Sequence, residues 1–406
     1  MRHIHNPASI VTAAFYVLAG GAVTACGGDD NHSTAPQTQV LHSFGKETPV
    51  VVAPSPLVLG KDGNFYGTAL GGDYNDGVVF KLTPAGVVSV VHSFDSSTGD
   101  GNEPSGLILA SDGNFYGTTV GGGTNSWGTV FKMTPDGTES VLYSFKGYPS
   151  DATYADSGLF QASDGNFYGT SEFGGPDNKG TVFKVSPSGI ETVLYSFGSV
   201  ASDPAVGFSR LVESDDGNFY GVSALGGTSN DGTVFKITPE GILTLVHSFT
   251  TGGSDGFHPS GLLKGSDGNF YGVTIGGGPN KNGVVYKLTP AGVETIVYAF
   301  DPSFGGSHPD GNLSQDSDGN LYGGTEAGGY PRTLCGNNGC SLTGQSGTIF
   351  EITAAGTAVL LSNFGPTDAD GTNPSGPPIQ GQDGNLYGVT TNGGANDAGV
   401  FYKITQ

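Results

Sequence analysis

Polar residues that differ between copies of a recurring segment are the strongest candidates for chemistry in this sequence. Three segments share the pattern Asp-Gly-x-x-Pro-Ser-Gly, at residues 100–106, 255–261 and 370–376, and a fourth related segment places a histidine before Pro309. Carboxylates and imidazoles bind polar ligands, hold cations and transfer protons. The candidate ligand-binding residues are therefore Glu103, His258, His308, Asn373, Asp100, Asp255 and Asp370.

The same residues also have a structural interpretation, which the sequence leaves open. Asp and Asn often start turns because their side chains bind nearby backbone amides. Residues 73–77 and 368–371 carry Asp and Asn at spacings that suggest calcium, but neither is a complete calcium loop with its final Glu. We therefore expect no cofactor and no resident metal, with calcium as the alternative. No catalytic residue is assigned.

The elements that carry these residues recur seven times. The motif Asp-Gly-Asn-[Phe/Leu]-Tyr-Gly begins at Asp62, Asp112, Asp164, Asp216, Asp267, Asp318 and Asp383. In the second copy, residues 106–110, 115–119, 129–133 and 140–145 are predicted to form four short strands, because turn residues separate them. The Asp-Gly turn at 111–114 is expected to be a type I′ hairpin. Four strands in about 50 residues is the size of a propeller blade.

The repeated side chains are expected to hold the blades together. Adjacent Phe and Tyr residues of the motif point to opposite faces of one strand, and both faces of a propeller blade are covered. The motif's Asp is expected to bind amides of its own turn, and its last Gly to let backbones approach closely. Six lysines of the third strands are expected to be solvated. Function is expected where the copies differ.

The order of the strands predicts a closed ring. The first strand, at residues 40–44, corresponds to the fourth strand of a unit, and the chain ends at Gln406 just after the third strand of the seventh unit. Pairing the two ends would complete the last sheet and remove two open edges. The sequence therefore predicts an all-β fold over residues 38–406. It is a seven-bladed β-propeller of four-stranded blades, with the N-terminal strand completing the last blade.

Composition excludes several classes of protein. The 406 residues include 72 Gly and 23 Pro, and only 13% of them are charged, which excludes a large helical protein. The 24 Phe and 17 Tyr are too many for a solvated tail. A net charge of −22 repels phosphate backbones, so no nucleic-acid partner is expected. We expect a monomer.

The first residues have the pattern of a bacterial export signal. Residues 10–23 form an uncharged, mostly apolar run that is too short to span a bilayer, and small residues lead from it to Cys26. We predict a lipoprotein-type signal peptide over residues 1–25, lipidation of Cys26 and a flexible linker over residues 27–37. Ordinary secretory cleavage is the alternative. By resemblance to such lipoproteins, the absence of Asp after the cysteine favours an outer-membrane anchor.

The two remaining cysteines, Cys335 and Cys340, fit an exported protein. Four residues separate them, and an oxidising compartment would allow a local disulfide. A metal site would need further ligands, and no other His or Cys lies nearby in the sequence. The partners expected for such a protein are the membrane, through the lipid anchor, and a glycan or an envelope protein.

The repeat resembles a known family. The stretch SDGNFYGTTVGGGTNSWGTVFKMTPDGTESVLYSF, within residues 111–145, is similar to the repeat of GloVer-repeat (choice-of-anchor tandem repeat) proteins. The resemblance covers residues 38–406 and implies an exported, surface-anchored protein without established catalytic residues. We expect a binding module that recognises a ligand or protein. An extracellular polysaccharide lyase or hydrolase is one alternative, and a structural surface protein is the other.

Overall fold

The computed structural model describes residues 37–406, apart from 201, 253–254, 302–304, 330–331, 337–338, 344–345 and 366–369. For the strands between 332 and 343 it describes the backbone. The chain divides into two compact units, Met1–Ala35 and Pro36–Gln406, and all described residues belong to the second. The predicted signal peptide, Cys26 and nearly all of the linker thus lie outside the described residues. Within the described part, no helix is long and apolar enough to cross a membrane.

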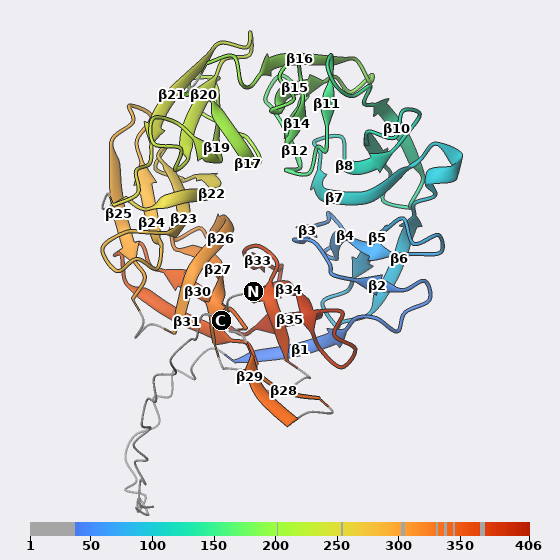
Figure 1. Ribbon diagram of the computed structural model, residues 1–406. Helices are drawn as coiled ribbons and strands as arrows, with labels where there is room; N and C mark the ends of the chain where they lie inside the picture. The colour runs from blue at the N-terminus through green and yellow to red at the C-terminus, as the bar shows by residue number, and fades with distance from the viewer. Residues whose placement is uncertain are drawn as a thin grey trace, which may run out of the picture. The chain divides into compact units, whose positions relative to one another are not determined.

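The second unit consists of seven sheets arranged in a ring (Figure 1). Blade one contains β2 (Val51–Val52), β3 (Val58–Leu59), β4 (Phe65–Gly71), β5 (Val78–Leu82) and β6 (Val88–Ser93). Blade two contains β7 (Gly101–Leu109), β8 (Phe115–Gly122), β9 (Thr129–Met133) and β10 (Glu139–Ser144), preceded by a short 3-10 turn, η1 (Ser96–Thr98). Blade three contains β12 (Leu159–Gln161), β13 (Phe167–Ser171), β15 (Thr181–Val185) and β16 (Glu191–Ser196), with a ribbon of β11 (Ala152–Thr153) and β14 (Phe173–Gly174).

The remaining blades follow the same order of strands. Blade four contains β17 (Pro204–Phe208), β18 (Val212–Glu213), β19 (Phe219–Gly226), β20 (Thr233–Ile237) and β21 (Leu243–Ser248). Blade five contains β22 (Phe257–Lys264), β23 (Phe270–Gly276), β24 (Val284–Leu288) and β25 (Glu294–Ala299). Blade six contains β26 (Gly306–Gln315), β27 (Leu321–Gly328), β30 (Thr348–Ile352) and β31 (Ala358–Asn363), with the hairpin β28 (Arg332–Gly336) and β29 (Gly339–Thr343). Blade seven contains β32 (Gly371–Pro374), β33 (Ile379–Gln380), β34 (Leu386–Gly393), β35 (Val400–Ile404) and β1 (Thr38–Ser43).

The N-terminal strand completes the last blade, as predicted. β1 pairs antiparallel with β35, from Thr38 opposite Ile404 to Ser43 opposite Val400. Figure 1 shows β1, at the start of the chain, beside the red C-terminal strands. The amide of Phe44 extends the pairing by donating to the Gly399 carbonyl at 3.0 Å. The described residues therefore form the closed seven-bladed propeller that the sequence predicted.

The turn between the first two strands of a blade differs from the predicted type. In blade two the Gly113 amide donates to the Ala110 carbonyl at 2.9 Å, and Gly113 has a φ of +84° while Asp112 keeps a negative φ. A type I′ turn needs positive φ at both central residues, so that prediction was wrong. The turn is type I followed by a left-handed glycine. The Asp112 carboxylate favours this form by accepting from the Asn114 amide at 3.0 Å, as expected of the motif's Asp.

Aromatic pairs join the blades at five of the seven seams, and Leu321 and Leu386 replace the phenylalanine at the other two. Tyr116 of blade two is 1% exposed and stacks on Phe167 of blade three, with 4.1 Å between ring centroids. The same pair closes the ring, since Tyr387 of blade seven lies 4.6 Å from Phe65 of blade one. The rings of the motif are buried, as predicted, except that Tyr271 is half-buried. The last glycine of the motif lies close to a ring of the third strand. A Cβ on Gly117 would lie 2.6 Å from the Phe131 ring, so a larger residue would not fit there.

Four of the six lysines of the third strands make ion pairs among the described residues, which the expectation of solvated lysines did not include. Lys132 Nζ lies 3.2 Å from the Asp112 carboxylate, which also accepts from the Tyr116 hydroxyl at 2.9 Å. Lys81, Lys287 and Lys403 make the equivalent ion pairs in blades one, five and seven. Lys132 Nζ also lies 5.5 Å from the centroid of the Tyr116 ring. The repeated Asp, Tyr and Lys thus form one structural cluster at this end of the blade.

Candidate functional site in the central channel

In blades two, five and six the first strand is longer than predicted, and this changes the place of the candidate residues. β7 begins at Gly101, so residues 101–106, which were expected to be a loop, belong to a strand that pairs with β8. Figure 1 shows these first strands, such as β7, β22 and β26, nearest the centre of the ring. The candidate residues before proline therefore lie on the innermost strands, at the end of the blade opposite the Asp-Gly-Asn turns.

One non-glycine residue in each blade, in or directly after an inner strand, has a left-handed backbone, with φ between +45° and +56°. These seven residues, called here the left-handed ring, are Ala53, Glu103, Tyr154, Val206, His258, His308 and Asn373. Such a conformation costs a non-glycine residue about 1–2 kcal/mol. A repeated contact must therefore hold the backbone in place.

That contact is made with the preceding blade. The Glu103 amide donates to the Asp76 carbonyl at 2.8 Å, and the His258 and His308 amides donate to the equivalent carbonyls of their preceding blades. The proline that follows packs on the preceding blade. Pro104 Cδ lies 2.2 Å from the position that a Cβ on Gly77 would take, so the glycine leaves room for the proline. The backbone at the ring is thus fixed by the seam between blades. The side chain at this position differs from blade to blade.

The four candidate residues before proline occupy equivalent positions in four blades. Glu103, His308 and Asn373 are exposed, and His258 is half-buried. The structure adds the other three members of the ring, of which Tyr154 is 43% exposed and Val206 is 45% exposed. One position therefore presents an acid, two imidazoles, an amide, a phenol and two aliphatic groups around the channel.

The candidate aspartates have partners outside this ring. Asp100 accepts from the Gly101 amide at 2.8 Å and lies 3.0 Å from His92 Nε2 on the outer strand of the preceding blade. Asp255 makes the same 3.0 Å contact with His247. Asp370 precedes β32, and its carbonyl accepts from the Gly394 amide at 2.9 Å. The structure thus places Asp100 and Asp255 at blade seams and does not bring them together with Glu103.

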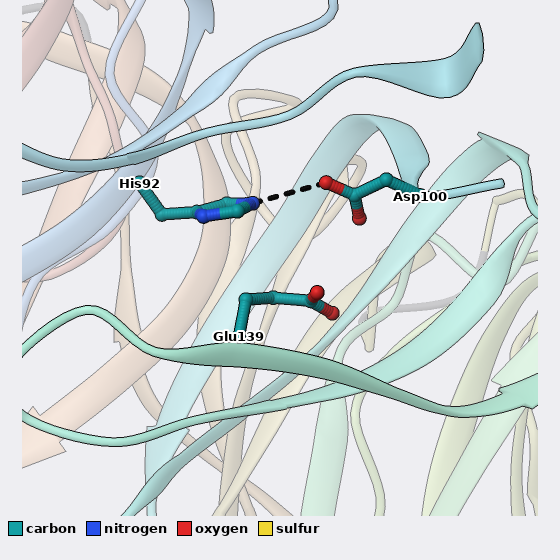
Figure 2. Close-up of side chains that lie close together, drawn as sticks. All are labelled: His92, Asp100 and Glu139. Carbon is teal, nitrogen blue, oxygen red and sulfur yellow. Dashed lines mark hydrogen bonds and ion pairs between the residues drawn. The ribbon is translucent and has the colours of Figure 1, made fainter. Parts of the chain in front are cut away.

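The seam between blades one and two contains a cluster that could hold a cation. Ligand atoms of His92, Asp100 and Glu139 all lie within 4.8 Å of one another, and Figure 2 shows the Glu139 side chain beside the His92–Asp100 pair. Burial, and then the charge of Asp100, raises the pKa of Glu139 to about 7. Among the described residues, no group hydrogen-bonds Glu139 Oε1.

The same arrangement recurs at other seams with different chemistry. Tyr143 donates to Asp151 at 2.7 Å, and burial, with Asp151 nearby, raises the pKa of Glu191 to about 7. A tyrosine in the place of His92 does not suit a divalent cation at neutral pH. The recurrence therefore identifies this cluster as a contact between blades.

The segment at residues 73–77, which suggested calcium, also has a structural role, because the Asp76 carboxylate accepts from the Ser96 amide at 2.8 Å.

A cavity of about 480 Å³ opens into the channel. Residues of blades one, two, three, four and six line it, and they include Glu103, Asp156, Arg210 and Asn312. Enclosure by the channel walls, and then the Glu172 carboxylate, raises the pKa of Asp156 to about 6. Burial lowers the pKa of the Arg210 guanidinium from its usual value. The cavity thus combines one cation, two acids and an amide from four blades.

A second cavity, of about 530 Å³, lies between blades six and seven. Asp310, Glu326 and Asn373 line it. Burial, and then the charge of Asp310, raises the pKa of Glu326. Asp310 accepts from the Ser260 hydroxyl and from the Gly311 amide. This is a second carboxyl pair on the channel side, equivalent in placement to Asp156 and Glu172.

The sequence analysis missed Asp156, Glu172, Arg210, Asp310 and Glu326. A signal for two of them was present, because each breaks the repeat at a fixed position. Arg210 precedes the leucine of the innermost strand, where other blades have Gly, Pro or Asn. Glu326 lies within β27, at a position where Leu70 and Ile275 stand in other copies and Glu172 stands in blade three. Aligning the copies position by position would have found both residues.

The backbone of the β28–β29 hairpin sets Cys335 directly opposite Cys340. Antiparallel neighbours of this kind lie close together across the ladder. The pairing in register agrees with a local connection between the two residues. The disulfide itself stays a prediction.

Comparison with solved structures identifies proteins with the same fold. Virginiamycin B lyase from Staphylococcus aureus is 13% identical, with a TM-score of 0.56 over 91% of this chain and 99% of that chain. The extracellular domain assigned to a hybrid two-component system of B. thetaiotaomicron is 12% identical, with a TM-score of 0.55 over 90% of this chain and 41% of that chain. A PQQ-bound aldose sugar dehydrogenase from Streptomyces coelicolor is 13% identical, with a TM-score of 0.42 over 71% of this chain and 92% of that chain. At such identities the likeness to the first two structures shows the fold alone.

Sequence comparison gives the family. No curated protein matches the chain. The profile of the Gloeobacter/Verrucomicrobia repeat matches residues 29–215 and 207–406, which together span the propeller. This confirms the resemblance found in the repeated motifs. The chain belongs to the Gloeobacter/Verrucomicrobia repeat family and folds as a seven-bladed β-propeller.

Proposed function

We propose that this protein is a binding module that recognises a polar ligand at the end of its channel where the left-handed ring lies. The supporting observation is the contrast between fixed backbone and variable side chain at that ring. Seven blades hold the same left-handed position, yet they present six residue types there. A surface that varies on a constant frame is typical of recognition sites. A glycan or an envelope protein is the expected class of partner.

Glycine substitution tests this proposal without disturbing the fold. Glycine adopts the left-handed region freely, so Glu103→Gly, Tyr154→Gly, His258→Gly and His308→Gly remove side chains and relieve strain together. The full chain and the fourfold variant are screened against arrays of glycans and envelope proteins. We expect the wild type to bind at least one array member and the variant to lose that binding while keeping its melting temperature.

A matched control uses the opposite end of the blades. Ile190 and Ile242 are exposed at turns between third and fourth strands, where other blades carry Thr138 and Thr357. The double variant Ile190→Thr and Ile242→Thr should bind like the wild type. Equal loss of binding in this variant, or full binding by the glycine variant, would contradict the assignment of the recognition surface.

An enzyme acting on extracellular polysaccharide is the second candidate function. The observation that favours it is the raised pKa of Asp156, about 6, with the Glu172 carboxylate nearby and an open cavity in front. A carboxyl that holds its proton near neutral pH can serve as a general acid. Polysaccharide cleavage by the wild type that Asp156→Asn abolishes would support this function. Cleavage that survives the substitution would remove Asp156 from it.

Export and lipid anchoring are part of the proposal. They rest on the apolar run at residues 10–23 and the small residues before Cys26. In bacteria grown with labelled palmitate, the chain should incorporate label and fractionate with the outer membrane. Cys26→Ser should abolish incorporation and release the protein. Unchanged membrane fractionation of that variant would exclude an anchor on Cys26.

A further inference from the structure

Arg210 is the one charged residue at its position in the repeat. The equivalent residues of the other blades are Pro56, Gly106, Gly158, Gly261, Asn312 and Pro377. Arg210 lies between β17 and β18, where the Ser209 amide donates to the Val222 carbonyl at 3.1 Å and Val212 pairs with Tyr220. This register places it midway along the innermost strand. Arg210 therefore lies deeper in the channel than the left-handed ring.

The Arg210 guanidinium has no counter-charge in the described part of the chain. No ion pair or side-chain hydrogen bond involves it there, and burial alone accounts for its lowered pKa. The lysines of the blades behave differently, since Lys132 and Lys287 each reach an aspartate. The Arg210 side chain is exposed to the channel, so its charge is solvated when no ligand is bound. A bound anion would supply the missing partner, through the paired N–H donors that make Arg suited to carboxylates.

The walls around Arg210 limit the kind of anion that fits. Glu103 and Asp156 line the same cavity, and two carboxylates repel a ligand that carries several negative charges. The same carboxylates accept hydrogen bonds from hydroxyl groups, and the Asn312 amide can both donate and accept. A volume of about 480 Å³ lies in the usual range for small-ligand sites. The cavity thus suits a ligand with one negative charge and several hydroxyls.

We infer that Arg210 binds the carboxylate of a hexuronic acid in the central channel, with Glu103, Asp156 and Asn312 facing its hydroxyls. This inference rests on the proposed function and specifies the charge and class of the ligand. The residue that binds the carboxylate, Arg210, lies outside the left-handed ring and comes from blade four alone. The ring residues at the mouth contact the rest of the ligand.

Calorimetric titration of the full chain tests the inference directly. The probes are glucuronate and galacturonate, with glucose as the neutral counterpart and inorganic sulfate as an anion without a sugar. The variant is Arg210→Gln, which removes the charge but keeps a polar side chain. The control is Lys264→Gln, which removes one cation at the opposite end of blade five, where Lys264 pairs with Asp215. Thermal unfolding of each protein reports whether it is folded.

Both uronates should bind the wild type and Lys264→Gln equally, and glucose should bind far more weakly. Arg210→Gln should weaken uronate binding about 10- to 100-fold, the range that one charge-assisted contact accounts for. Its melting temperature should not fall, because the Arg210 side chain is exposed to the channel and makes no ion pair in the described part of the chain. Equal uronate binding by Arg210→Gln, sulfate binding as tight as uronate binding, or absence of uronate binding would each overturn the inference. Binding of neutral glycans that the ring variant alone abolishes would leave the proposed function standing.

Discussion

Charged side chains have different surroundings at the two ends of a blade. At the turn end, the carboxylate of Asp112 accepts from Tyr116 and Lys132, and the same three residue types meet in other blades. At the channel end, the left-handed ring changes its side chain from blade to blade, and Arg210 has no counter-charge in the described part of the chain. Groups that satisfy one another stabilise the fold. Groups left unsatisfied in a cavity are available to a ligand.

The largest effect expected is at the repeated end. Tyr116→Ala removes a buried ring that stacks on Phe167 and a hydroxyl that binds Asp112. Truncating a buried aromatic residue costs about 3–5 kcal/mol of unfolding free energy. Urea unfolding should show this loss. Tyr116→Phe, which keeps the ring, should cost only about 1 kcal/mol. Equal losses in the two variants would mean that the stacking contributes little.

An intermediate effect is expected at the seams, where pH should change stability. The unfolded chain releases the proton of Glu139 near pH 4.5, whereas the folded chain holds it up to about pH 7. The folded state therefore binds more protons in that window, and the free energy of unfolding falls as pH rises through it. Glu191 acts in the same direction. The double variant Glu139→Gln and Glu191→Gln mimics the protonated form, so its melting temperature should decline less than that of the wild type. An identical decline would contradict the assigned pKa shifts.

The smallest effect on stability is expected at the left-handed ring. Glu103→Gly relieves a φ of +52°, but it also gives the unfolded chain more freedom. These effects oppose each other, so the unfolding free energy should change by less than about 0.5 kcal/mol. Urea unfolding measures the change. Glu103→Val, with a branched side chain at the same φ, should be clearly destabilised. A large loss in the glycine variant would mean that the Glu103 side chain stabilises the fold, against the contrast between the two ends.

The fold was predictable because the motifs of one blade recur seven times in the sequence. Motif spacing gave the blades, and the position of residues 40–44 within the repeat gave the closure by β1. The turn type was missed because Asp-Gly suits more than one turn, and the side chain of Asp112 decides between them. The extent of β7 was missed because Asp-Gly-x-x-Pro is typical of loops. Pairing with β8 and the hydrogen bond from Glu103 to the preceding blade hold that segment as a strand.

The candidate site was predictable only in part. Glu103 and His258 were identified because they differ at one position of a shared segment. Arg210 was missed because its neighbours in the cavity, Asp156 and Asn312, come from blades about 50 to 100 residues away in the chain. Composition and local spacing do not report such contacts. Comparing the copies of the repeat at every position does identify the residues that differ.

The most direct test of the separation between fold and recognition is urea unfolding of wild type and Arg210→Gln, with and without glucuronate. A ligand that binds only the folded state adds to the unfolding free energy by mass action. Glucuronate should stabilise the wild type and leave Arg210→Gln unchanged, and without ligand the variant should be at least as stable. A variant that is less stable without ligand, or that glucuronate stabilises as much as the wild type, would contradict the account.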